Sequence, residues 1–136
     1  MFEILEHTAD IGFRATAETP AELFETAAVA LVSLAMDTAD VTPRESVELT
    51  AEGDSIESLL VNWLSEVLYC LDGEGLALSK FKVRELTANR VVGEAAGERR
   101  DSQRHEPKLV IKGVTYHQLK IEHNEQGWSC EVYLDI

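Results

Sequence analysis

The sequence predicts an α+β domain in which two helices pack on one face of a largely antiparallel β-sheet. Two stretches with helical periodicity lie among several stretches in which apolar and polar residues alternate. The order is strands, one helix, a strand, a second helix and then several strands. A chain of 136 residues fits a single domain with a real core, and we find no internal repeat, so residues 1–136 are treated as one domain.

Two short strands are expected at the N-terminus, with a polar junction between them. Phe2 and Ile4 share one side of the first, and apolar side chains alternate with other residues from Ile11 to Ala17. The junction, His7 to Asp10, brings together an imidazole, a hydroxyl and a carboxylate. Loops held by a sheet often carry chemistry, so this junction is the first candidate for a functional site.

The first helix has a clear start. Thr19 is a suitable N-cap, Pro20 fits the first helical position, and Glu22 completes a capping-box pattern. Apolar residues at helical spacing then predict a helix from about Pro20 to Met36, with one face covering a sheet.

The second helix is expected to be the more buried one. Asp54 with Glu57 repeats the capping-box pattern, and a broad apolar face runs from Ile56 to about Cys70. Glycines 73 and 75 then end the helix and open a turn.

The remaining sequence predicts strands separated by turns, at residues 46–52, 81–85, 90–95, 118–123 and 128–136. Residues 98–107 have no apolar face, so a mobile surface loop is expected there, and His105 is given no role. Its arginines could touch phosphate, although a solvated loop is the simpler interpretation. The final strand has the clearest alternation, with Trp128, Cys130, Val132, Leu134 and Ile136 on one face.

Composition excludes several classes of protein. A formal net charge of -13 argues against unaided binding to a phosphate backbone and suits cations or a basic protein partner. Cys70 and Cys130 lack the spacing of a redox or zinc motif and are interpreted as reduced core thiols. No apolar run is long enough to span a bilayer, and the first residues do not form a signal sequence, so a cytoplasmic protein is expected.

Three carboxylates are candidates for a metal site. Asp135 adjoins the terminal carboxylate of Ile136, and Asp10 would join them if the first and last strands are neighbours. A cluster of oxygen ligands suits a hard divalent ion such as Ca²⁺ or Mg²⁺. From spacing alone, separate solvation of each acid is the favoured interpretation.

Other polar residues carry weaker signals. His7 could bind a metal or carry a proton, or could simply cap a turn, and His117 is a similar case. Lys112 could approach a phosphate or a partner's carboxylate, or face water. The sequence has no P-loop, nucleophile elbow or recognisable catalytic triad.

Taken together, the chain resembles the archease family nearly end to end. The stretches that carry the resemblance are His7-Thr8-Ala9-Asp10-Ile11-Gly12, Leu59-Leu60-Val61-Asn62-Trp63-Leu64 with Leu68-Tyr69, Gly93-Glu94, Lys112-Gly113-Val114-Thr115-Tyr116-His117 and Leu134-Asp135-Ile136. The resemblance weakens in residues 98–107.

This resemblance implies an activator of the RtcB-type RNA-splicing ligase rather than an enzyme. Archeases promote guanylylation and turnover of that ligase in tRNA splicing and RNA repair, so RNA would be met only through the ligase. The family's metal site would correspond to Asp10, Asp135 and the carboxylate of Ile136, binding Ca²⁺ or Mg²⁺. Lys112 would correspond to the family's functional lysine and, with His7, would contact the ligase or its nucleotide.

Two other functions remain open from the residues. One is a small metal-dependent phosphoester hydrolase that uses Asp10, Asp135 and His7. The other is an interaction domain that binds no metal.

Overall fold

The structure is a computed structural model, and it describes residues 1–6 and 10–136. The elements follow one another as β1 (Phe2–Glu6), β2 (Asp10–Ala17), α1 (Pro20–Ala35), β3 (Glu45–Glu52), α2 (Ile56–Asp72), β4 (Leu76–Leu86), β5 (Arg90–Arg99), β6 (Gly113–Asn124) and β7 (Gly127–Asp135). No helix in the described part of the chain is long and apolar enough to span a membrane.

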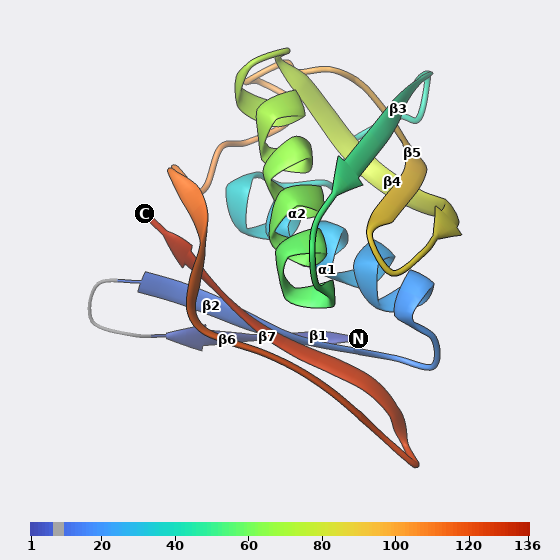
Figure 1. The fold of residues 1–136 in the computed structure, drawn as a ribbon. Coiled ribbons are helices and arrows are strands. Elements are labelled where there is room, and N and C mark those ends of the chain that lie inside the picture. The colour runs from blue at the N-terminus through green and yellow to red at the C-terminus, as the bar shows by residue number, and fades with distance from the viewer. Residues whose placement is uncertain (7–9) are drawn as a thin grey trace.

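The predicted α+β class, with two helices and antiparallel strands, is confirmed. The strands form two sheets rather than one, a four-stranded sheet in the order β1-β2-β7-β6 and a three-stranded sheet in the order β3-β5-β4. Helix α1 contacts β2 and β4, and α2 contacts β3 and β6, so each helix touches both sheets (Figure 1). The helices therefore need apolar stripes wide enough to face two sheets.

The first helix begins as predicted. The Thr19 hydroxyl accepts a hydrogen bond from the backbone N–H of Glu22 at 3.2 Å. The Glu22 carboxylate accepts from the N–H of Glu18, also at 3.2 Å, and not from that of Thr19, so the predicted capping box is not closed. The Thr19 bond occupies a donor that the helix start would otherwise leave free.

The second helix is capped one residue later than predicted. Ser55 is the N-cap, and its hydroxyl accepts from the N–H of Ser58 at 3.1 Å. The Ser58 hydroxyl in turn accepts from the N–H of Ser55 at 3.0 Å. Two serines thus form the reciprocal capping box, and the predicted pairing of Asp54 with Glu57 was wrong. The N–H of Gly73 closes the last turn on Tyr69.

A buried tryptophan links the two helices. Trp63 on α2 is fully buried, and its indole N–H donates to the carbonyl of Phe24 on α1 at 3.0 Å. The same two side chains pack with ring centroids 6.4 Å apart. The contact satisfies the polar atom of a large core side chain.

The alternation predicted for the last strand is confirmed at its centre, where Cys130, Val132 and Leu134 are buried on one face of β7. Its partner β6 runs from Gly113 to Asn124, and the irregularity in their pairing falls between Thr115 and Lys120. This irregularity is a bulge within one strand, so β6 begins earlier than the predicted start at residue 118.

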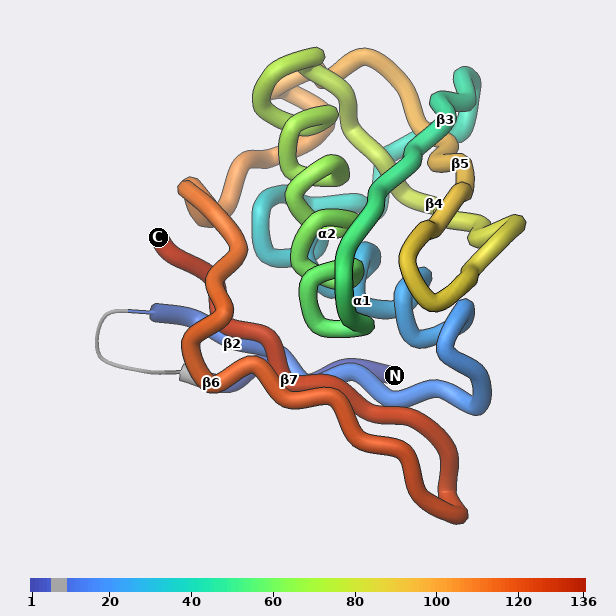
Figure 2. The backbone as a smooth tube through the Cα atoms, viewed as in Figure 1, coloured from blue at the N-terminus to red at the C-terminus, as the bar shows by residue number. Residues whose placement is uncertain are grey.

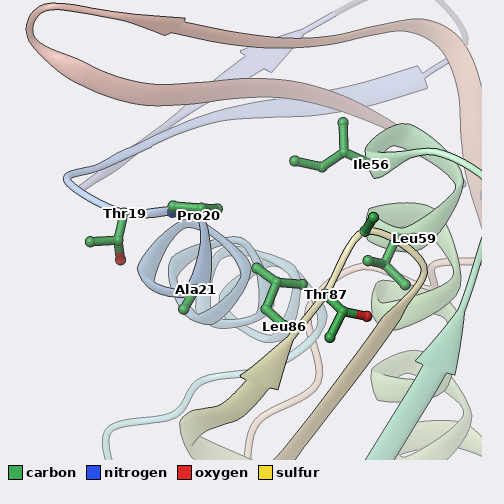
Figure 3. Close-up of a pocket in the computed structure, with 8 residues that line it drawn as sticks. Thr19, Pro20, Ala21, Ile56, Leu59, Leu86 and Thr87 are labelled. Carbon is green, nitrogen blue, oxygen red and sulfur yellow. The ribbon is translucent and has the colours of Figure 1, made fainter.

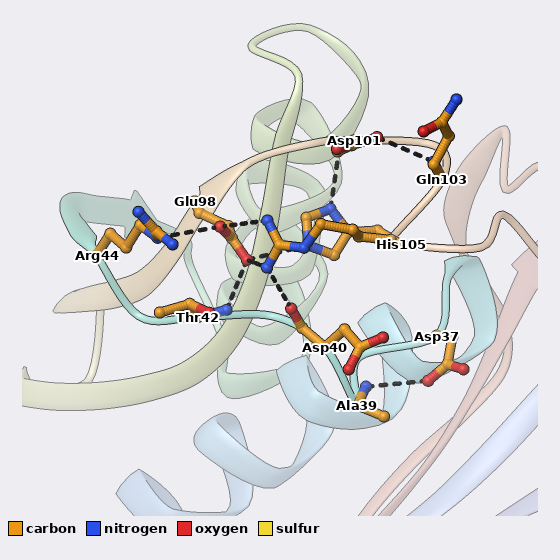
Figure 4. A network of polar contacts seen from close by, with 10 residues as sticks. Asp37, Ala39, Asp40, Thr42, Arg44, Glu98, Asp101, Gln103 and His105 are labelled. Carbon is orange, nitrogen blue, oxygen red and sulfur yellow. Dashed lines mark hydrogen bonds and ion pairs between the residues drawn. The ribbon is translucent and has the colours of Figure 1, made fainter.

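Residues 98–107 are mostly exposed, as predicted for a surface segment, but two of them are buried and held by polar contacts. Glu98 lies inside β5 and is buried, and His105 is completely buried. Figure 4 shows Glu98 between Arg44 and His105, with hydrogen bonds holding the segment to neighbouring parts of the fold. The prediction missed this anchoring because the contacts are polar and the segment has no apolar face.

Candidate functional site

The two aspartates predicted to share a metal site lie directly opposite each other. Asp10 opens β2 and Asp135 ends β7, and the register of this antiparallel pair places them as partners. Figure 2 shows the C-terminal end of the chain next to the start of β2. Opposite residues in an antiparallel pair project from the same face of the sheet, where like charges repel. The geometry thus places two acids on one face at one edge of the fold.

A third strand adjoins Asp135 on its other side. Gly113 of β6 pairs with Asp135, and the N–H of Lys112 donates to the Asp135 carbonyl at 2.7 Å. The Lys112 side chain is exposed. Ile136 follows Asp135 and is 40% exposed, so the terminal carboxylate is one residue from the aspartate pair. We call Asp10, Asp135 and the terminal carboxylate of Ile136 the acidic edge.

A tyrosine lies on the same face as the acidic edge, two residues before Asp135, and packs closely against β2. Tyr133 is only 6% exposed, and a Cβ added to Gly12 would lie 2.7 Å from its ring. The Thr115 hydroxyl donates to the Tyr133 carbonyl at 3.1 Å. Only a residue without a side chain allows this close approach between β2 and β7.

The acidic edge has no counter-ion among the described residues. No Lys or Arg of residues 1–6 or 10–136 forms an ion pair with Asp10 or Asp135. Farther along the same face, Arg14 pairs with Glu3 and Glu131, and these carboxylates raise its pKa, chiefly through the hydrogen bond to Glu131. On this face, the central carboxylates of Glu3 and Glu131 are paired with an arginine, whereas Asp10 and Asp135 face each other at the edge of the sheet.

Two side-chain carboxylates and a terminal carboxylate would supply only oxygen ligands, which suits a hard divalent ion. Within the described residues, no three His, Cys, Asp or Glu side chains gather closely enough to hold a metal. The terminal carboxylate would therefore be needed as the third ligand. The residues present fit such an ion, whereas His7 lies outside the described residues.

The comparisons with known proteins agree on one family. The model of the Archease protein family matches residues 2–136. The chain belongs to the archease family. A curated relative, protein archease of Methanopyrus kandleri, is 40% identical over 138 residues, covering 99% of each chain. Protein archease of Pyrococcus furiosus is 39% identical, covering 99% of this chain and 98% of the relative.

Solved structures share the fold of this archease. The solution structure of protein 1598 from Methanobacterium thermoautotrophicum superposes with a TM-score of 0.86 at 33% identity, covering 99% and 98% of the two chains. A crystal structure of an archease from Thermotoga maritima, described as a possible chaperone, gives a TM-score of 0.68. It covers 100% of this chain and 98% of the other at 22% identity, and supports the fold alone.

An apolar cavity of about 460 Å³ lies where the starts of both helices meet the β4–β5 hairpin (Figure 3). Its eight described lining residues are apolar or bear a hydroxyl, namely Thr19, Pro20, Ala21, Ile56, Leu59, Leu86, Thr87 and Ala88. Because none of them titrates near neutral pH, this cavity lacks the groups for acid–base or metal chemistry. The chemistry available to the archease lies elsewhere.

Sequence reasoning missed a second polar cluster, centred on Glu98. One oxygen of this carboxylate accepts from Arg104 and lies 3.4 Å from Arg44 Nε. The other accepts from Arg104 at 2.8 Å and from the Thr42 N–H at 2.7 Å, and lies 3.1 Å from His105 Nε2. Hydrogen bonds from Arg104, then from Thr42 and His105, outweigh burial and lower the pKa of Glu98 to about 2.

No local pattern in the sequence announces this cluster. Thr42 and Arg44 lie in the segment before β3, far along the chain from Glu98. Its residues are polar, and each is common in solvated loops. Only the structure shows that this segment returns to the core, where Pro107 pairs with Met36 after α1.

Proposed function

We propose that this archease activates an RtcB-type RNA-splicing ligase by promoting its guanylylation and turnover, with a divalent ion held at the acidic edge. Membership of the family supports the class of function. The observation that carries the site is the direct pairing of Asp10 with Asp135 beside the chain's terminal carboxylate. RNA is met only through the ligase.

The residues of the acidic edge have separate roles in this proposal. Asp10 and Asp135 supply oxygen ligands from two strands, so their separation is fixed by the sheet. The exposed ammonium of Lys112 is available to a phosphate or a carboxylate of the ligase complex. A divalent ion held there would supply positive charge near phosphate oxygens, which phosphoryl transfer requires.

Charge also favours the encounter with a basic partner surface. The chain carries a formal net charge of -13, which would speed its association with a positively charged active-site mouth. Added salt screens this attraction and would slow the association. In this proposal the acidic edge, where β2, β7 and β6 pair, presents its carboxylates to the ligase.

The deciding experiment compares Asp10→Asn and Asp135→Asn with the unchanged protein. Each substitution keeps the shape of the side chain and removes its charge. We expect both to lose most of their stimulation of ligase guanylylation, measured as transfer of labelled GMP to the ligase. Asp72→Asn is the control, because Asp72 is exposed at the end of α2 and forms no ion pair within the described residues. Full stimulation by folded Asp10→Asn would overturn the proposal.

The two other functions make different predictions. A metal-dependent hydrolase would release product from a phosphoester without any ligase, and this release would depend on Asp10. A metal-free interaction domain would give no heat of Ca²⁺ or Mg²⁺ binding in calorimetry that Asp10→Asn removes. The proposed activator gives such heat and releases no product alone.

A further inference from the structure

Four of the seven arginines in this acidic protein line one surface pocket. The pocket has a volume of about 690 Å³ and is lined by Arg44, Glu45, Glu98, Arg99, Arg100, Asp101, Ser102 and Arg104. We call it the arginine pocket. It lies over β5 and the segment after it, on the three-stranded sheet, whereas the acidic edge belongs to the four-stranded sheet.

A buried carboxylate, that of Glu98, contacts two of the arginines that line the arginine pocket. Glu98 is 5% exposed, and both of its oxygens are occupied by Arg104, Arg44, Thr42 and His105. Because its acceptor sites are used internally, it orients the guanidinium groups instead of competing for an anion from solvent. Both terminal nitrogens of Arg104 donate to the Glu98 carboxylate, and Nη2 also donates to the Asp40 carbonyl at 2.9 Å.

Other donors of the arginine pocket remain available. Arg44 is 67% exposed and comes closest to Glu98 through Nε, and within the described part of the chain its two terminal nitrogens donate no hydrogen bond. Within the described part of the chain, the guanidinium of Arg100 has no hydrogen-bond or ion-pair partner, and Arg99 gives one nitrogen to the Glu74 carbonyl. Guanidinium forks of this kind match the geometry of phosphate oxygens.

The lining selects a class of ligand. It has no aromatic or large apolar side chain, so no aromatic ring is available to stack on a base. A long polynucleotide would meet a protein surface of net charge -13 beyond the pocket. A compact anion with several phosphoryl oxygens gains the arginines without that repulsion.

We propose that the arginine pocket binds the oligophosphate group of a small ligand, with Arg44 and Arg100 as contacts and Glu98 as the positioning residue behind them. The site recognises phosphate oxygens and is indifferent to the base. It is independent of the ligase and of the acidic edge.

Calorimetric titration in EDTA tests this site, because a chelator removes any binding that runs through a divalent ion. The probes are inorganic triphosphate, GTP, CTP and a single-stranded RNA without a terminal phosphate. We expect triphosphate to bind, GTP and CTP to agree within about twofold, and added salt to weaken all three. Arg100→Gln and Arg44→Gln should each weaken binding by at least about fivefold, since each removes a charge-assisted contact.

Arg90→Gln is the matched control, because Arg90 is an exposed arginine at the other end of β5 and lies outside the pocket. It should bind triphosphate like the unchanged protein. Absence of triphosphate binding, or binding that survives both Arg44→Gln and Arg100→Gln, would overturn the site. Tighter binding of the RNA than of triphosphate would overturn the choice of ligand. Circular dichroism of each variant verifies the fold.

Discussion

The Nε2 atom of His105 lies 3.1 Å from a carboxylate oxygen of Glu98, and both side chains are buried. The other ring nitrogen of His105, Nδ1, accepts the N–H of Asp101 at 2.9 Å. Because Nδ1 accepts, Nε2 carries the proton and donates it to Glu98. One imidazole thus ties the segment after β5 to the strand itself.

His105→Ala is therefore expected to destabilise the protein by about 2–4 kcal/mol, since it opens a cavity and leaves buried partners unpaired. His105→Gln should cost less, because an amide can keep one of the two bonds. The measurement is urea unfolding followed by circular dichroism. Equal stability of His105→Ala and the unchanged protein would mean that the segment is held without this ring.

The lowered pKa of Glu98 predicts a specific loss of stability in acid. The carboxyl has a pKa of about 2 in the folded state against an ordinary value of 4.5. Its contribution is complete above pH 4.5 and disappears as the pH falls toward 2. We expect the stability gap between the unchanged protein and Glu98→Gln to be widest near neutral pH and to shrink across that interval.

Glu48→Gln provides the control for this titration, because Glu48 is an exposed carboxylate on β3 without an ion pair among the described residues. Its variant should follow the pH dependence of the unchanged protein. A gap for Glu98→Gln that stays constant from pH 7 to about pH 2.5 would contradict the assigned role of Glu98.

The contrast between the two polar sites explains what the sequence can reveal. The positions of Asp10 and Asp135 at strand ends were predictable from local alternation, whereas their pairing was a conditional expectation that the resemblance to the archease family favoured. The Glu98 cluster was not predictable, because its partners come from segments that only the tertiary fold brings together. Apolar periodicity reports burial of apolar faces and gives no signal for a polar segment anchored by ion pairs.

The same limit applies to the sheets. Periodicity located both helices and most strands, yet it could not separate one sheet from two, because pairing partners are a property of the whole fold. The width of the apolar stripes on α1 and α2 was the available sign that each helix has two sheets to cover.

Gly12→Ala is expected to disturb the pairing of β2 with β7 beside the acidic edge. Its new Cβ would meet the Tyr133 ring at 2.7 Å and the Val132 carbonyl at 2.9 Å, so either the ring or the strand pairing must shift. We expect a loss of about 1–3 kcal/mol in unfolding free energy. Gly113→Ala, at the other side of Asp135, meets nothing within 4 Å and should stay within about 0.5 kcal/mol of the unchanged protein. Similar losses for both variants would contradict close packing at Gly12.

Both cysteines should be inert in the folded protein. Burial raises the pKa of Cys70 to about 11 and that of Cys130 to about 12, so the reactive thiolate is scarce near neutral pH. We expect no reaction with an aromatic disulfide reagent at pH 8 until denaturant is added, and then two thiols per chain. Cys70→Ser reports Cys130 alone, and rapid labelling of the folded variant would contradict the burial.

The third ligand of the proposed metal site is the carboxylate at the end of the chain, which no side-chain substitution removes. Extending the chain by Gly-Ser after Ile136 moves this group by up to about 7 Å and leaves Asp10 and Asp135 in place. Even groups that only support metal ligands are worth about 10–100-fold in affinity, so losing a direct ligand should weaken Ca²⁺ binding by at least about tenfold.

Calorimetry with Ca²⁺ provides the measurement for the extended chain, and Asp72→Asn provides the unaffected control. Urea unfolding in EDTA should show equal stability for the extended and unchanged proteins, because Ile136 is exposed and lies beyond the last paired residue. Stimulation of ligase guanylylation should fall in parallel with Ca²⁺ affinity. If Ca²⁺ bound equally well to the extended protein, the terminal carboxylate would not be a ligand, and Asp10 and Asp135 would have to hold the ion with other groups.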